Sequence, residues 1–265
     1  MMSTTLPRSD LGHGLTGWLQ GEGRPLLLIH GVGLQADAWL PMAPMLTPHF
    51  AVTAVDMPGH GKSEKLSGTP SLVEYTDRIA KIIDAPSVVI GHSMGALIAI
   101  DLAVRYPEKV QAIVPLNAVF QRSDEAATAV LARAENMAAG SGTDPGPTLD
   151  RWFGAATAAE APASRAACER WLREVDQAAY AQAYLAFATA TDPSDEDLAA
   201  IACPALLMTG ELEPNSTPDM SFALAKRMGH AKVAIVPQAR HMMPMTHADE
   251  VCGTLYTFVL NTLGT

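Results

Sequence analysis

The sequence is poor in cysteine, and its cysteines form no recognisable pattern. Only three occur in 265 residues, at Cys168, Cys203 and Cys252, and no two of them make a CxxC pair. An odd number of widely spaced cysteines favours neither a disulfide framework nor a zinc site. We therefore expect small residues buried in the interior, and no metal site.

Runs of lysine and arginine are also missing. The chain carries 18 Lys and Arg against 28 Asp and Glu, which gives a formal net charge of −10. Without basic clusters, an acidic chain is poorly suited to bind nucleic-acid phosphates or anionic lipid. Nucleic acid is therefore not an expected partner.

No uninterrupted apolar stretch is long enough to cross a membrane. The most apolar long segment, 87–104, is interrupted by His92, Ser93 and Asp101. The first residues also lack the basic start and apolar stretch of a secretory signal. We expect a cytoplasmic protein that does not associate with membranes.

Short apolar runs alternate with longer amphipathic stretches along most of the chain. The runs rich in Val, Ile and Leu are 25–30, 50–56, 87–91, 111–117, 204–210 and 232–237. None alternates strictly with polar residues, which is typical of strands buried on both faces of a mostly parallel sheet. Residues 71–85 have helical spacing, and another helix is expected from Ala96 to the residue before Pro107. The pattern predicts a doubly wound α/β fold, with one or two antiparallel strands within 11–20.

Residues 118–200 interrupt this alternation. The segment is rich in alanine, contains helix-like stretches, and has no strand-like run between them. We predict a helical cap inserted into a sheet domain made of 1–117 and 201–265. A chain that is 48% hydrophobic can bury a core large enough for one such domain.

A serine nucleophile is predicted at the end of the third strand. Gly91, Ser93 and Gly95 form a G-x-S-x-G motif between an apolar strand and a helix, which is where a nucleophile elbow occurs. The sharp turn forces the serine into a strained conformation, and the glycines leave room for neighbouring backbone. Its hydroxyl would then project at the positive end of a helix.

A serine hydroxyl needs a base to accept its proton, and His241 is the best placed of the eight histidines. It follows the strand 232–237 through a short loop and precedes a C-terminal helical stretch. A structural histidine is the alternative interpretation.

The base in turn needs a carboxylate, which should follow the strand 204–210 in the chain order serine, acid, histidine. Glu213 lies far enough round the loop to reach His241, while Glu211 still belongs to the end of the strand. We predict Glu213 as the acid, with Glu211 as the alternative. The end of 111–117 is another position for an acid, but it holds Asn117, which cannot be an anion.

Donors for a developing oxyanion are predicted on two turns. The amide of Met94 follows the nucleophile, and the amide of Val32 belongs to the turn "HGVG" after the first apolar run. The segment "DMPGHGKS" is predicted to be a structural loop organised by Asp56.

Five segments together carry a family resemblance: "LLLIHGVGLQADAW", "VDMPGHGKS", "GHSMGA", "LLMTGELEPNSTP" and "VPQARHMMP". The chain resembles the α/β hydrolase superfamily over nearly its whole length outside the insertion, and is most similar to 3-oxoadipate enol-lactonase-like hydrolases. In the cap, 151–156 and 180–192 resemble lid segments of that group. The resemblance implies that Arg151 and Trp152 line the substrate pocket; a surface arginine beside a core tryptophan is the alternative.

The expected activity is cofactor-independent hydrolysis of an ester, lactone or related activated carbonyl, with a small molecule and water as partners. Amide hydrolysis, carbon–carbon bond hydrolysis, acyl transfer and perhydrolysis on the same scaffold are alternatives, and a slow ligand sensor is a further one. Met242 stands where meta-cleavage hydrolases usually have a tryptophan, which counts against that subgroup. The apolar cap helices could support a homodimer.

Overall fold

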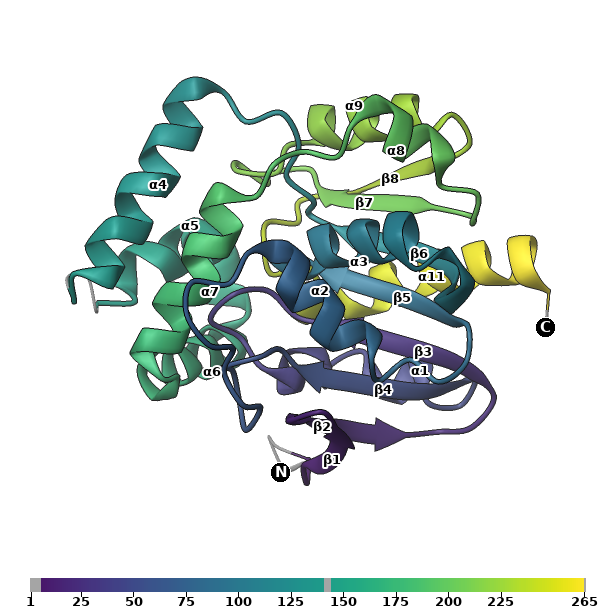
Figure 1. The fold of residues 1–265 in the computed structure, drawn as a ribbon, viewed down its shortest axis with the longest axis horizontal. Helices are drawn as coiled ribbons and strands as arrows, with labels where there is room; N and C mark the ends of the chain where they lie inside the picture. Colours follow the sequence, from purple (N-terminus) through teal and green to yellow (C-terminus); the bar gives the residue numbers. More distant parts are fainter. Residues whose placement is uncertain (1–5, 141–143, 265) are drawn as a thin grey trace.

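The chain is built around a single sheet, seen in a computed structural model that describes residues 6–140 and 144–264, with only the backbone for 155–160 (Figure 1). The strand order is β1-β2-β4-β3-β5-β6-β7-β8. β2 pairs antiparallel with β1 and β4, and β3 to β8 run parallel. The strands are β1 (Ser9–Gly12), β2 (Leu15–Gln20), β3 (Arg24–Ile29), β4 (Phe50–Asp56), β5 (Ser87–His92), β6 (Val110–Leu116), β7 (Leu206–Gly210) and β8 (Lys232–Val236). The predicted fold class, including the antiparallel start, is confirmed.

Helices cover both faces of this sheet. They are η1 (Ala36–Trp39), α1 (Ala43–Leu46), α2 (Leu72–Ala80), α3 (Met94–Arg105), η2 (Pro107–Lys109), α4 (Asp124–Ala138), α5 (Gly146–Glu160), α6 (Pro162–Glu174), α7 (Gln177–Thr189), α8 (Asp195–Ala200), α9 (Pro218–Met228), α10 (Met243–Thr246) and α11 (Ala248–Leu263). Alternate residues of β3 enter two separate cores, because successive strand side chains point to opposite faces. Leu27 and Ile29 belong to the core that also contains residues of α2, α3 and α9, whereas Leu26 and Leu28 belong to the core that contains residues of α1 and α11.

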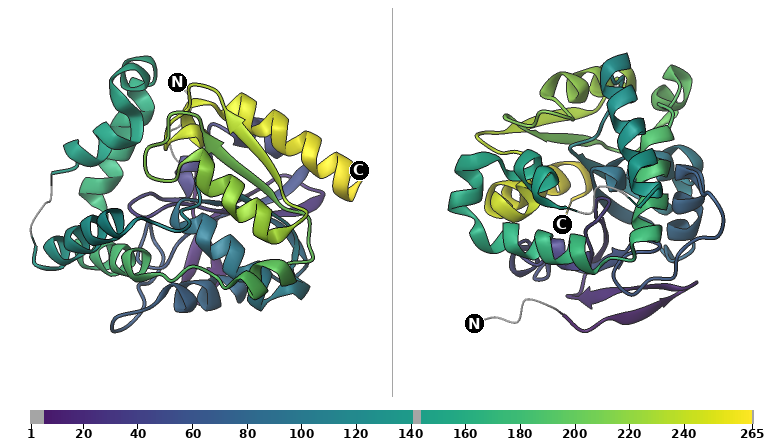
Figure 2. Two further views of the ribbon diagram at one scale, coloured as in Figure 1. Left: turned by 90° about the horizontal axis from the view of Figure 1, so that it is seen from above. Right: turned by 90° about the vertical axis from the view of Figure 1, so that its left-hand side faces the viewer.

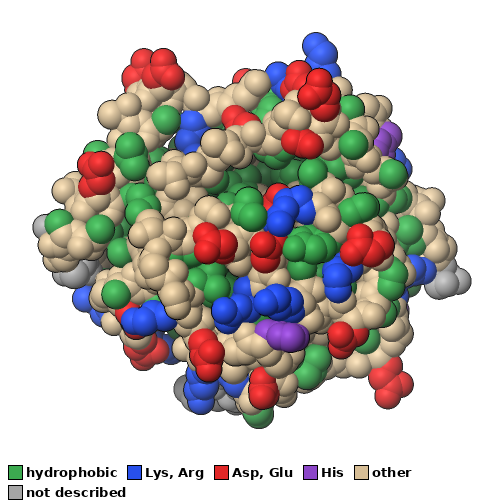
Figure 3. All heavy atoms as spheres, viewed as in Figure 1, with side chains coloured by type: hydrophobic (Ala, Val, Ile, Leu, Met, Phe, Trp, Pro, Cys, Tyr) green, Lys and Arg blue, Asp and Glu red, His purple; other side chains and the backbone are tan. Residues whose placement is uncertain are grey.

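Four helices, α4 to α7, form a cap at the carboxyl ends of the parallel strands (Figures 1 and 2). Within it, α4 packs against α7 and α5 packs against α6. The last helix of the predicted insertion, α8, instead packs against α9 and α3 of the sheet domain. Hydrophobic side chains line a hollow between cap and core on the face drawn in Figure 3. A groove of about 500 Å³ runs there between α3 and the segment after α7.

Some helix boundaries differ from those expected. The helix predicted over 71–85 begins as expected, with a capping box formed by Ser71 and Glu74, but ends at Ala80. The long helix-like stretch after 164 is two helices, because Val175 is extended and the Asp176 side chain accepts hydrogen bonds from the first amides of α7. In α5, Gly154 has φ +65° and kinks the helix. These breaks depend on single residues, which periodicity does not detect.

The three cysteines have different exposures. Cys168 and Cys252 are buried and Cys203 is half buried. Burial raises the pKa of Cys203 to about 11 and that of Cys252 to about 12, so both thiols stay protonated at neutral pH. In the part of the chain that the structure describes, no helix is long and apolar enough to cross a membrane.

Candidate active site

Ser93 occupies a sharp turn between the end of β5 and the start of α3. Its backbone has φ 58° and ψ −117°, a conformation that residues with a Cβ rarely adopt. A Cβ on Gly91 would collide with the carbonyl of Gly95, and a Cβ on Gly95 would collide with the carbonyl of Ile29. Glycine is therefore required on both sides of Ser93, as the motif predicted.

The ring of His241 is held by a buried carboxylate. The His241 Nδ1 lies 3.0 Å from Oε2 of Glu213, whose side chain follows β7 and is only 3% exposed. The other oxygen of Glu213, Oε1, accepts hydrogen bonds from the amides of Asn215 and Ser216, at 2.8 and 3.2 Å. The predicted acid and base are thus adjacent in space.

Glu213 is suited to remain an anion. Burial by itself would raise the pKa of Glu213, but the neighbouring His241 and the two backbone amides outweigh it, and the pKa is lowered. Glu211, the alternative acid, instead accepts hydrogen bonds from the amide and side chain of Gln238, at 2.9 and 3.1 Å. Glu211 therefore ties the β7 and β8 loops together and does not contact His241.

The backbone carbonyl of His241 is held by two side chains that the sequence analysis did not assign to the site. Nε2 of His92 and Nδ2 of Asn117 each donate a hydrogen bond to this carbonyl at 2.8 Å. Burial, reinforced by the nearby charge of His241, lowers the pKa of His92 to about 3, so His92 is a neutral donor. The His92 and His241 rings lie 4.8 Å apart.

Asn117 also joins two loops of the site. The side-chain oxygen Oδ1 of Asn117 accepts a hydrogen bond from the backbone amide of Gly210 at 3.2 Å. The backbone amide of Asn117 donates to the backbone carbonyl of Met208 at 2.8 Å. Asn117 is fully buried and has φ 52°, a left-handed conformation that asparagine tolerates better than most residues. An asparagine at a strand end is the one sequence signal that could have indicated this role.

Replacing Asn117 by glycine is expected to lower the free energy of unfolding by about 1–3 kcal/mol, because the His241 carbonyl and the Gly210 amide each lose a buried partner. Glycine accepts the positive φ, so the change removes the side chain without adding backbone strain. Urea denaturation checks the value. Gln121→Gly is the matched control, because Gln121 has the same φ of 52° but an exposed side chain. Equal effects of the two variants would contradict a bridging role for Asn117.

Of the two amides predicted to bind an oxyanion, that of Met94 directly follows Ser93, and that of Val32 belongs to the loop whose Gly31 lies against Ser93. Within the described ranges, neither the Val32 amide nor the Met94 amide donates a hydrogen bond to the backbone or to a side chain. The loop that carries Val32 is fixed by its neighbours: the Gly33 amide donates to Nε2 of His60 at 3.0 Å, and Nε2 of His30 accepts from Met57 at 2.9 Å. The loop therefore leaves the Val32 amide without a hydrogen-bond acceptor among the described residues.

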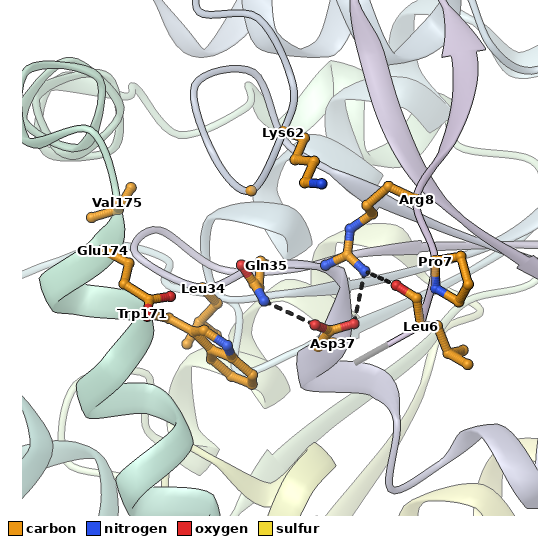
Figure 4. A pocket seen from close by; sticks show the side chains of 11 residues that line it. Leu6, Pro7, Arg8, Leu34, Gln35, Asp37, Lys62, Trp171, Glu174 and Val175 are labelled. Carbon is orange, nitrogen blue, oxygen red and sulfur yellow. Dashed lines mark hydrogen bonds and ion pairs between the residues drawn. The ribbon is translucent and has the colours of Figure 1, made fainter. Parts of the chain in front are cut away.

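A buried ion cluster anchors the other end of this loop. Arg8 donates to Asp56 at 2.7 Å and to Asp37 at 2.8 Å, and the second oxygen of Asp56 accepts from the Ala36 amide at 2.8 Å. Arg8, Asp37 and Gln35 lie on one side of a cavity of about 500 Å³, and Trp171 and Glu174 of α6 line its other side (Figure 4). Asp56 thus organises the loops, as predicted, but its partner Arg8 was not anticipated from the sequence.

Arg151 and Trp152, the residues predicted to line the pocket, lie on α5 of the cap. The Trp152 ring stacks over His241, with 5.8 Å between ring centroids and 26° between planes. Arg151 donates to the hydroxyl of Thr148 at 3.5 Å. Trp152 therefore contacts the predicted base directly, whereas Arg151 lies one residue away on the same helix.

The sheet, the cap and the Ser93 turn are together typical of α/β hydrolases, and sequence comparison identifies the same family. The chain belongs to the alpha/beta hydrolase family, which it matches over residues 26–254. It is 37% identical to the (E)-2-((N-methylformamido)methylene)succinate hydrolase of Acinetobacter baylyi, over 88% of this chain and 89% of that one. Its relatives include named hydrolases and esterases, so the chain is a hydrolase of this family.

Two solved structures have the same architecture. An enol-lactonase from Burkholderia xenovorans superimposes with a TM-score of 0.83 and 25% identity, over 96% of this chain and 99% of that one. A thermophilic esterase from Thermogutta terrifontis, with malate bound, has a TM-score of 0.85 and 24% identity, over 94% and 93% of the two chains.

Proposed function

We propose that this protein is a serine hydrolase that cleaves an ester or lactone of a small acid through an acyl-enzyme. The observation that carries the proposal is the 3.0 Å contact between His241 and the buried Glu213, in a site where Ser93 has the strained backbone of a nucleophile elbow. If Glu213 and His241 were only structural, there would be no need for a buried carboxylate beside an imidazole at the carboxyl ends of the strands.

Each residue of the site has a defined role in the proposed reaction. The Ser93 oxygen attacks the substrate carbonyl carbon while His241 takes the hydroxyl proton, and Glu213 stabilises the resulting imidazolium. The amides of Val32 and Met94 donate to the oxyanion of the tetrahedral intermediate. As the intermediate collapses, the proton on His241 passes to the leaving oxygen. Water then attacks the acyl-enzyme, and His241 takes its proton and returns it to Ser93.

Amide hydrolysis is the second candidate reaction. The relative from Acinetobacter baylyi is named for a substrate with an N-methylformamido group on a methylenesuccinate. The proposed residues also serve an amide, because His241 can protonate a departing nitrogen as it protonates an oxygen. Because the substrate in this relative's name is a substituted succinate, the similarity also supports a small substrate with carboxylate groups for the present protein. Parallel assays of ester, lactone and enamide derivatives of succinate separate these reactions.

Treatment with a fluorophosphonate tests the proposed nucleophile. We expect a single modification, located at Ser93 by peptide mass mapping, because only a serine beside a proton acceptor reacts with this reagent at neutral pH. Heat-denatured protein is the control and should not be labelled. Folded protein that stays unlabelled at Ser93, or is labelled at another serine, would contradict the proposed mechanism.

A further inference from the structure

Two arginines of the cap converge on one buried hydroxyl. Arg133 of α4 and Arg151 of α5 each donate a hydrogen bond to Oγ1 of Thr148, whose side chain is buried. Both guanidinium groups therefore lie within a few ångströms of the same oxygen, and both arginines are half buried. Like charges brought together where water screens them only in part repel each other, and an anion bound between them offsets this repulsion.

The protein supplies no such anion within the residues that the structure describes. Neither Arg133 nor Arg151 forms an ion pair with a described aspartate or glutamate, whereas Arg165 and Arg173 of the neighbouring helix α6 do. The Arg133 guanidinium instead lies over the ring of Tyr184, 5.6 Å from its centroid. The positive charge at Thr148 is therefore left uncompensated by these residues.

This cluster lies on the face of α5 that is directed at the proposed base. Thr148 and Trp152 are four residues apart, so their side chains lie on the same side of the helix about 6 Å apart along its axis. Trp152 stacks on His241, which places Thr148 one helical turn from the proposed site of reaction. On the other side, Tyr184 contacts Tyr180, and the Tyr180 ring lies against Gly33 of the loop that carries Val32.

We propose that Arg133, Arg151 and Thr148 form a subsite that binds a carboxylate of the substrate. Two guanidinium groups offer charge-assisted hydrogen bonds to the carboxylate oxygens, and the Thr148 hydroxyl orients them. A spacing of about one helical turn suits an acid whose carboxylate is separated from the reacting carbonyl by about two or three carbons. The inference rests on the proposed hydrolase function and narrows its substrates to short acids of this kind.

Two esters with the same leaving group test the subsite. 4-Nitrophenyl hemisuccinate carries the carboxylate, and 4-nitrophenyl levulinate replaces it by a neutral methyl ketone of similar size. We expect the wild-type protein to prefer the hemisuccinate in kcat/KM, and Arg133→Gln or Arg151→Gln to lower this preference about 10- to 100-fold. Arg133→Lys should retain part of it, because the charge remains but the planar fork is lost.

Arg173→Gln is the matched control, because Arg173 is an exposed cap arginine that pairs with Glu169 at 2.8 Å. It should leave the preference unchanged. If Arg133→Gln and Arg151→Gln also leave it unchanged, or lower the rates of both esters equally, the subsite is wrong and the arginines are structural.

Calorimetric titration with glutarate separates the subsite from the proposed reaction. If glutarate binds Arg133→Gln about 10-fold or more weakly than it binds the wild-type protein, the subsite is supported. This holds even if the wild-type protein hydrolyses neither ester, and in that case only the proposed hydrolysis is wrong. Glutarate binding of equal strength in wild type, Arg133→Gln and Arg151→Gln would overturn the subsite whatever the ester rates are.

Discussion

Replacing Ser93 by alanine is expected to lower kcat/KM for a hydrolysed ester by about 10⁴- to 10⁶-fold. The variant removes the proposed nucleophile and leaves the proposed oxyanion donors and the His241–Glu213 pair in place. Alanine keeps the Cβ of serine, so the strain at φ 58° is the same in both proteins and the fold should be retained. Residual hydrolysis should be no faster than that of a site which only binds the substrate and stabilises the oxyanion.

Steady-state rates and far-ultraviolet circular dichroism, measured on the same preparation, check this result. Ser67→Ala is the control, since Ser67 is exposed on the loop that precedes α2. A folded Ser93→Ala protein that retains more than about a tenth of the wild-type rate would exclude an acyl-enzyme at this residue.

Glu213→Gln is expected to lower kcat about 10³- to 10⁴-fold. The amide is close in size to the carboxylate but is neutral, so it no longer stabilises the imidazolium that forms when His241 takes the serine proton. Labelling of Ser93 by a fluorophosphonate should slow by a similar factor, because it depends on the same proton transfer. Glu211→Gln provides the comparison. Because Glu211 contacts Gln238, this substitution should have little effect on kcat. A larger loss in Glu211→Gln than in Glu213→Gln would reverse the assignment.

The same substitution has a signature in stability against pH. The pKa of Glu213 is lower in the folded protein than in the unfolded chain, so its ionised form stabilises the fold at neutral pH. That contribution is complete above the unfolded pKa of about 4.3 and is lost as pH falls through the folded pKa. The difference in unfolding free energy between wild type and Glu213→Gln should therefore shrink below about pH 4.

Much of the fold could be predicted because its signals are local. The parallel strands are continuous apolar runs, and each was located to within about two residues by composition alone. The Ser93 turn is also encoded locally, since two glycines and a strand-to-helix change lie within a few residues of it. The chain order of strand ends then led to Glu213 and His241, which the structure brings to 3.0 Å.

The contacts that were missed join distant segments. The partners of Arg8 are 29 and 48 residues away, and Asn117 reaches His241 across 124 residues. No periodicity or spacing indicates such pairs, because the sheet order and the loop paths decide them. Arg133 was missed for another reason: Thr148 is only 15 residues away, but the contact depends on how α4 and the start of α5 are placed, and a single arginine in an alanine-rich helix has no distinguishing pattern.

The contacts of Asn117 tie the proposed acid to the loop after β7. If the proposed acid followed β6 instead of β7, it would have to be an aspartate at position 117, and Glu213 would not be needed for that role. Aspartate alone would place a second anion in the site and remove the donor to the His241 carbonyl, and loss of Glu213 alone would remove the anion. Both single steps pass through an impaired protein. In the proposed mechanism, moving the acid from the loop after β7 to position 117 therefore requires both substitutions together.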